Sequence, residues 1–295
     1  MVWGIWHVID DSLVEFQDNT FTLATIRWRW VAAAAIFYLA SLVPMGWFWY
    51  RVLASLGQPV GLYAALRAYI IGHLGKYVPG KALVLVLRAG LLQPAGVPTS
   101  AAVLSVILET FNMMAVGAAL AAGFLSWQLE GQRAMQIFAC GAAAAMLLPL
   151  LPPVSRPLIR WLIRKKVRDA DSRRRVELPF SVVASGWLAI AVGWFLMTAS
   201  MMATISAVVM DQQPGWSIDL AVRAVSATTL SVVGGFVSML PGGIGVREWI
   251  MDQLLEAPLG KVSAVLTVVF LRVTWLATEI VAAVALYLIP PSEER

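Results

Sequence analysis

The sequence has few of the residues that bind metals or form cross-links. Its 295 residues include one cysteine, Cys140, and two histidines, His7 and His73. A single cysteine cannot form an internal disulfide, and this set is too small for a His/Cys cluster of the kind that holds zinc or haem. No arrangement of a nucleophile and a base stands out either. The sequence therefore predicts no metal site, no cofactor and no enzymatic activity.

Charged residues are also scarce. Only 13% of the residues are Asp, Glu, Lys or Arg, whereas soluble domains average about 25%. Hydrophobic residues make up 60% of the chain, and its mean hydropathy is +0.77. These values indicate that lipid is the main solvent. We therefore expect residues 1–295 to form a single integral membrane domain, an all-α polytopic membrane protein.

The net charge of +5 comes from one segment, the connection 153–176. Its basic residues are Arg156, Arg160, Arg164, Lys165, Lys166, Arg168, Arg173, Arg174 and Arg175. In a soluble protein such a run could bind nucleic acid. Between two long apolar segments it indicates instead the cytoplasmic side of a membrane, next to anionic lipid headgroups. No nucleic-acid partner is therefore predicted.

Apolar runs long enough to cross a membrane occur five times. A full span needs roughly 20 mostly apolar residues. The segments that meet this requirement are 31–50, 99–126, 134–152, 180–210 and 262–289. Residues 1–29 combine acidic and aromatic side chains and are predicted to form an interfacial N-terminal segment.

Two further apolar stretches, 61–92 and 217–256, are each interrupted by Pro-Gly. Pro241-Gly242 follows Pro79-Gly80 by 162 residues, and the same offset aligns the Ala-Val-Leu that comes after each break. Proline removes a backbone donor and glycine lowers helix propensity. Each stretch is therefore predicted to be two short helices that form a re-entrant hairpin. An ordinary proline kink is the alternative.

The repeated break divides the chain into two similar units. Repeat 1 spans 31–126, repeat 2 spans 180–289, and a linking helix over 134–152 lies between them. An odd number of crossings from one unit to the next predicts an inverted repeat, an arrangement common in transporters. Non-helical backbone in a membrane must be covered by protein or water, so the two breaks should face each other or a cavity. The side of the N-terminus is left open, because it changes if 61–92 crosses the membrane.

Charges inside the predicted spans raise a functional question, because they are costly in lipid. Glu109 lies near the middle of 99–126, and Arg272 near the middle of 262–289. The 162-residue offset places Glu109 one position from Arg272. We therefore expect these two residues to pair, either as a structural ion pair or as one that releases Arg272 for an anionic ligand.

Cations next to the breaks are the second group of candidates. Lys76, Lys81 and Arg88 lie around the first break, and Arg247 follows the second, with Glu248 beside it. Free backbone N–H groups at the start of a helix, together with a nearby cation, favour anion binding. The backbone of Pro241, Gly242 and Gly243 would allow the ligand to approach closely. The alternative is that these cations extend to the membrane surface.

The second break carries a resemblance to a known family. Residues 240–248, LPGGIGVRE, resemble the PGGLGVRE signature of the transmembrane region of lysylphosphatidylglycerol synthases and of related stand-alone membrane proteins. Residues 76–81, KYVPGK, look like the family's earlier basic Pro-Gly motif, although 82–84 lack its usual small polar pattern. Glu109 and Arg272 fall where the family has acidic and basic residues. The resemblance covers most of the chain from about residue 30.

This resemblance implies a lipid flippase in a bacterial or archaeal cytoplasmic membrane, with membrane lipids as partners. The lipid would carry an anionic or modified headgroup and be a phospholipid, a polyprenyl-linked lipid or a hopanoid. The family's soluble transferase domain is expected to be absent, since the sequence ends at Arg295. The alternative function is a non-transporting accessory subunit that presents a lipid to a separate membrane or cytoplasmic transferase. Whether the chain forms a homo-oligomer is left open.

Overall fold

A computed structural model describes residues 25–58, 60–78, 82–128, 133–148, 179–209 and 217–289. All regular elements within these ranges are helices. In chain order they are α2 (Trp28–Ser55), α3 (Leu62–His73), the 3-10 turn η2 (Leu74–Tyr77), α4 (Ala82–Leu92), α5 (Thr99–Gln128), α6 (Arg133–Leu147), α9 (Phe180–Val208), α10 (Ile218–Val237), the 3-10 turn η4 (Pro241–Gly243), α11 (Val246–Leu259) and α12 (Lys261–Leu288).

Five of the described helices are long and apolar enough to cross a membrane: α2, α5, α9, α10 and α12. The prediction of an all-α polytopic membrane protein is therefore confirmed. Four of these helices match predicted spans. The fifth predicted span, 134–152, corresponds to α6, which has 15 residues, and the end of that span lies outside the described residues.

The helix α10 takes the place of that fifth span and corrects the prediction for 217–256. It has 20 residues, so this stretch does not begin with a short helix. The Ser217 hydroxyl caps its start by accepting a hydrogen bond from the Leu220 N–H at 3.1 Å. The helix then continues through Gly234 and Gly235, because an apolar environment leaves the backbone groups no better partners than those within the helix. It ends at Val237, four residues before Pro241.

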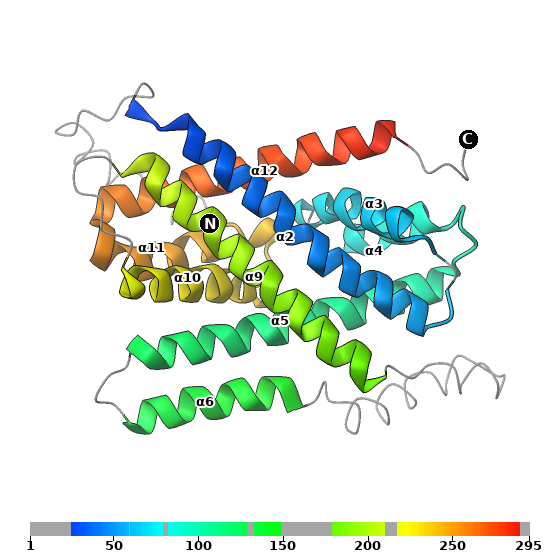
Figure 1. Cartoon of the computed structure of the whole chain (residues 1–295), viewed down its shortest axis with the longest axis horizontal. Coiled ribbons are helices and arrows are strands. Elements are labelled where there is room, and N and C mark those ends of the chain that lie inside the picture. Colours follow the sequence, from blue (N-terminus) through cyan, green and yellow to red (C-terminus); the bar gives the residue numbers. More distant parts are fainter. Residues whose placement is uncertain are drawn as a thin grey trace.

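The turn η2, which precedes the first Pro-Gly break in the sequence, and the turn η4, which contains the second, lie next to each other. In Figure 1, α5 and α12 extend across the picture, α3 and α4 occupy its right half, and α10 and α11 its left half. The turns η2 and η4 therefore meet, and a Cβ added at Gly242 would lie 3.0 Å from the Tyr77 ring. Pro79 and Gly80 lie outside the described residues, so the prediction that the two breaks face each other stays a prediction, and the structure shows only that η2 meets η4. The re-entrant path of each stretch through a bilayer stays a prediction.

The order of elements repeats along the chain. A long helix, a broken pair and a second long helix occur as α2, α3–α4, α5 and again as α9, α10–α11, α12. The two broken pairs come from opposite ends of the molecule (Figure 1), which is the placement expected for an inverted repeat. The predicted interfacial segment falls mostly outside the described residues, and the basic connection 153–176 falls entirely outside them.

The first helices of the two units, α2 and α9, cross as a packed antiparallel pair (Figure 1). Small residues make this crossing close: a Cβ at Gly186 would lie 2.2 Å from the Phe48 ring, and one at Gly193 would lie 2.8 Å from the Met45 side chain. Lipid offers apolar side chains the same surroundings as a protein core, so close van der Waals packing of this kind holds membrane helices together. The contact between α2 and α9 therefore holds the two units together around the cavity between them.

Candidate functional site

A cavity of about 310 Å³ lies between the two units. Both units contribute to its walls, which are mostly apolar and include methionine and aromatic side chains from α2, α5, α9 and α10. The charged side chains among the described lining residues are Lys76, Arg88, Glu109 and Arg247. They come from η2, α4, α5 and α11, so each broken stretch supplies at least one cation.

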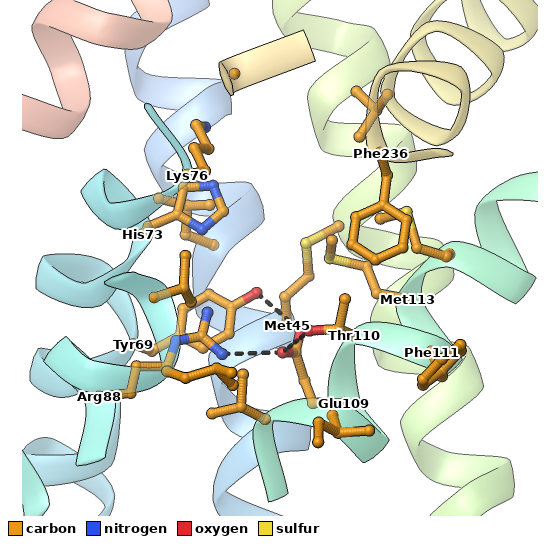
Figure 2. A pocket seen from close by; sticks show the side chains of 18 of the residues that line it. Met45, Tyr69, His73, Lys76, Arg88, Glu109, Thr110, Phe111, Met113 and Phe236 are labelled. Carbon is orange, nitrogen blue, oxygen red and sulfur yellow. Dashed lines mark hydrogen bonds and ion pairs between the residues drawn. The ribbon is translucent and has the colours of Figure 1, made fainter. Parts of the chain in front are cut away.

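An ion pair closes one end of the cavity. Arg88 Nη1 donates to Glu109 Oε2 at 2.9 Å, and both side chains are 3% exposed. The Tyr69 hydroxyl donates to the other carboxylate oxygen at 3.3 Å. Figure 2 shows Arg88 and Tyr69 converging on Glu109, with His73 and Lys76 further along the cavity wall. This cation is therefore already neutralised within the first unit.

Packing holds the Arg88 guanidinium in place. It lies 4.0 Å from the centroid of the Tyr69 ring and 5.0 Å from that of Trp49, which is within the range of a cation–π contact. Trp49 is oriented in turn by a 2.9 Å hydrogen bond from its indole N–H to Ser105 Oγ. Gly72 leaves space for the methylene groups of the Arg88 side chain, because a Cβ at Gly72 would lie 2.5 Å from Arg88 Cγ.

A second acidic cluster lies beside the first break. Glu279 of α12 is fully buried, and its Oε1 accepts from Lys76 Nζ at 2.5 Å. The Tyr38 hydroxyl donates to the same oxygen. The Tyr38 ring stacks on Trp275 at a centroid distance of 4.6 Å. The Trp275 indole N–H donates to Ser200 Oγ at 2.9 Å, so α2, α9 and α12 together position the cluster.

The second break is organised by Glu248. Its carboxylate accepts from the Gly245 N–H at 2.6 Å and from Arg272 Nε at 2.7 Å. Arg272 also donates to the Gly242 carbonyl oxygen at 3.0 Å. Gly242 and Gly243 have φ values of 60° and 70°, in the left-handed region that side chains disfavour. Glycine is therefore required for the backbone to turn here and receive Arg272.

Arg247 differs from Lys76 and Arg88, the other cations of the cavity wall, in having no hydrogen-bond or ion-pair partner among the described residues. It is 8% exposed, and its side chain makes no hydrogen bond or ion pair with any other described residue; its Nε is fully buried. It is packed between glycines, since a Cβ at Gly235 or Gly243 would lie within 3 Å of it. The 162-residue offset maps Arg247 onto Leu85, and Leu271 stands where the first unit has Glu109. One buried positive charge in the cavity wall therefore has no ion pair or hydrogen bond within the described part of the chain.

The sequence profile of one family matches almost the whole chain. The family described as the lysylphosphatidylglycerol synthase TM region matches residues 14–284. The chain belongs to this family. A membrane lipid-related role follows from that membership, and the matched part is the transmembrane region, not a soluble catalytic domain. A search of curated proteins gives no significant match.

In this member of the lysylphosphatidylglycerol synthase TM family, most of the predicted site residues lie around the central cavity. Arg88, Glu109, Gly242 and Arg247 line it. Pro241 and Gly243 form η4, and Glu248 with Arg272 holds that turn in shape. Lys81 and the Pro79-Gly80 break lie outside the described residues. No group of three or more His, Cys, Asp or Glu that could hold a metal ion occurs among the residues described.

Two expectations about these charges are wrong. Glu109 pairs with Arg88 and not with Arg272, which pairs with Glu248. The sequence offset gave similar depths for Glu109 and Arg272, but each finds an opposite charge within its own unit. Arg88 and Arg247 also do not extend to the membrane surface, since both are buried.

Sequence reasoning missed the cluster of Tyr38, Lys76 and Glu279 as a functional group. A signal for part of it was present in the sequence, because Glu279 is a carboxylate in an otherwise apolar helix and such residues are expensive there. Its partners come from α2 and η2, more than 200 residues earlier in the chain. Nothing in the local pattern of α12 indicates them.

Proposed function

We propose that this protein moves a lipid with an anionic headgroup between the leaflets of the cytoplasmic membrane, and that Arg247 binds the headgroup phosphate. Membership of the family supports a lipid-related role. The position of the cavity, between two broken stretches from opposite ends of the molecule, is typical of substrate sites in inverted-repeat transporters.

The proposal rests on one observation: the buried guanidinium of Arg247 has no ion pair or hydrogen bond with another described residue. An arginine side chain stays protonated in proteins, so it cannot become neutral by losing its proton. Burying an unpaired charge is costly, and a bound anion would remove that cost. The planar guanidinium also offers several donors in a geometry that fits phosphate oxygens. A phosphate beside Arg247 therefore completes the charge balance of the site.

The apolar walls of the cavity support an amphiphile over a soluble anion. A volume of about 310 Å³ is at the lower end of ordinary ligand sites and suits a headgroup with the first part of its glycerol or prenyl chain. The acyl chains of such a lipid would remain in the hydrocarbon of the surrounding bilayer, so binding would not expose them to water.

Leaflet exchange in proteoliposomes tests the proposal. Fluorescent phosphatidylglycerol and a fluorescent polyprenyl phosphate would be followed by chemical quenching of the outer leaflet. We expect wild-type protein to accelerate exchange of at least one of them over empty liposomes. Arg247→Gln should slow it by about ten- to a hundredfold, because a hydrogen bond to a charged group contributes about 1.5–3 kcal/mol.

Arg223→Gln is the matched control. Arg223 is also an arginine of the second broken stretch, but it is partly exposed and pairs with Asp219 on the surface of α10. We expect this variant to match the wild type. Exchange no faster than in empty liposomes would refute transport. Full activity of Arg247→Gln would refute the headgroup site, and stable lipid binding without exchange would indicate the accessory function instead.

A further inference from the structure

The ion pair of Lys76 and Glu279 joins the first unit to the second. Among the described residues, Arg88–Glu109 lies within the first unit and Arg272–Glu248 within the second. Lys76 belongs to η2 of the first unit, and Glu279 belongs to α12 of the second, with 2.5 Å between Nζ and Oε1. Any movement of one unit against the other at the cavity therefore strains or breaks the Lys76–Glu279 pair.

The Glu279 carboxylate depends on this single cation. Both of its close contacts, from Lys76 and from the Tyr38 hydroxyl, fall on Oε1. His73 Nε2 lies 3.9 Å from the same oxygen, beyond hydrogen-bond distance. Oε2 is buried and has no hydrogen-bond partner among the described residues. Without Lys76, the ionised carboxylate would be buried with only hydroxyl groups, those of Tyr38 and Tyr77, as close polar neighbours.

Lys76 lines the same cavity as Arg247. Its ammonium sits on a flexible stem and carries three donors that can rotate between acceptors. It also lies in the repulsive fields of Arg247 and Arg272. An anion held at Arg247 would replace that repulsion with attraction, and so would draw the ammonium away from Glu279.

We propose that Glu279 is a proton-binding site linked to the headgroup site through Lys76. The linkage rests on the proposed function, since it needs an anion at Arg247. When the headgroup phosphate binds, Lys76 Nζ leaves Glu279 Oε1 and donates to a phosphate oxygen. A proton from the aqueous phase then bonds to Glu279 Oε2, because a buried carboxylate without a cation is neutralised in preference to remaining charged. One lipid monoanion and one proton are taken up together.

Several other groups face Glu279 and bear on its proton. Those on the elements packed against it are Tyr38 of α2, His73 of α3, Lys76 and Tyr77 of η2, and Arg247 of α11, with Arg272 two turns before it on α12. None of these is a carboxylate. The described neighbours therefore offer no second acid to take the proton in place of Glu279.

A ligand-free experiment tests the proton site alone. Infrared spectra of the purified protein at neutral pH would be compared for Lys76→Met and the double variant Lys76→Met/Glu279→Gln. We expect the carbonyl band of a protonated carboxylic acid in the first and its loss in the second. Lys76→Arg keeps the cation and should lack the band. Identical spectra of the single and double variants in this region would overturn the proposal.

A second experiment tests the linkage and needs only the wild type and Glu279→Gln, so it stands even if Lys76→Met fails to fold. Dioleoylphosphatidylglycerol would be titrated calorimetrically into detergent-solubilised protein, in two buffers of different ionisation enthalpy. A phosphodiester stays a monoanion, unlike a phosphate monoester with its second pKa of about 6, so any proton exchange arises in the protein. We expect uptake of about one proton per lipid by the wild type and none by Glu279→Gln.

The outcomes separate the two proposals. Lipid binding by the wild type without proton uptake overturns the linkage but leaves the headgroup site standing. Absence of binding, both of dioleoylphosphatidylglycerol and of the polyprenyl phosphate used in the exchange assay, refutes the headgroup site and the linkage, and the infrared comparison then decides whether Glu279 binds a proton on its own. Proton uptake that persists in Glu279→Gln would place the proton elsewhere and overturn the assignment.

Discussion

The buried pair of Arg88 and Glu109 allows a sharp prediction about stability. Each side chain is 3% exposed, so removal of either one leaves the other charge buried without its partner. We predict that Glu109→Leu and Arg88→Met each destabilise the protein strongly. The double variant Arg88→Met/Glu109→Leu, which replaces the pair by apolar side chains of similar size, should be close to the wild type.

The structure sets the magnitudes. Breaking a buried ion pair costs about 3–5 kcal/mol when one partner stays behind. The lower end applies to Glu109→Leu, because Arg88 keeps its contacts with the Tyr69 and Trp49 rings, and a desolvated cation–π contact stabilises by about 2 kcal/mol. Exchange of a whole buried pair for apolar residues is often neutral or stabilising. We therefore expect about 3 kcal/mol for Glu109→Leu, about 3–5 kcal/mol for Arg88→Met and less than about 1 kcal/mol for the double variant.

Reversible unfolding in mixed micelles, driven by increasing sodium dodecyl sulfate, would measure these differences through tryptophan fluorescence. Asp219→Asn is the control, since the Asp219–Arg223 pair is exposed and removal of such a pair costs no more than about 1 kcal/mol. The reasoning is refuted if the double variant loses as much stability as the two single variants together. That result would mean that the residues stabilise the fold independently and not as a pair.

Two pairs of variants test the packing of α5 and the second break. A Cβ at Gly117 would lie 2.5 Å from the buried Trp194 ring, so Gly117→Ala should lower the free energy of unfolding by about 1–3 kcal/mol through overpacking. A Cβ at Gly123 on the same helix meets no atom within 4 Å, so Gly123→Ala should raise the free energy of unfolding by up to about 1 kcal/mol. The same unfolding assay measures both, and equal effects would contradict the packing explanation. Glu248→Ala removes the acceptor of the Gly245 N–H and of Arg272 and should cost about 1–3 kcal/mol. Glu248→Gln should recover part of this loss, and a thermal melt that ranks the alanine variant above the glutamine variant would count against the role of Glu248.

Sequence periodicity located the centre of the fold correctly. The 162-residue offset between Pro79 and Pro241 predicted two equivalent breaks, and η2 and η4 do meet in the structure. The offset works because a proline followed directly by glycine combines a missing backbone donor with a low helix propensity, whereas α2 continues through the single Pro44. The length of α10 was harder to predict, since an apolar environment allows its helix to run through Gly234 and Gly235.

The pairing of charges could not be predicted in the same way. Sequence position gives the depth of a residue along a helix, but the partner depends on how the helix is rotated about its axis and on which neighbour packs there. Glu109 and Arg272 were assigned similar depths, yet each pairs with a residue of its own broken stretch. The position of Arg247 beside the second break was predicted, whereas its lack of a partner became visible only in three dimensions.

The ion pairs of the two units have opposite polarity, and this decides whether one unit could replace the other. In the first unit the broken stretch supplies the cation, Arg88, and the long helix the acid; in the second the broken stretch supplies Glu248 and the long helix the cation. A symmetric dimer of first units would leave two Lys76 side chains without Glu279 and would contain no Arg247. A dimer of second units would bury two Arg247 side chains together with two Glu279 carboxylates that lack Lys76. The two halves are therefore not interchangeable, since only a pair of unlike units completes the Lys76–Glu279 ion pair and keeps a single Arg247 in the cavity wall.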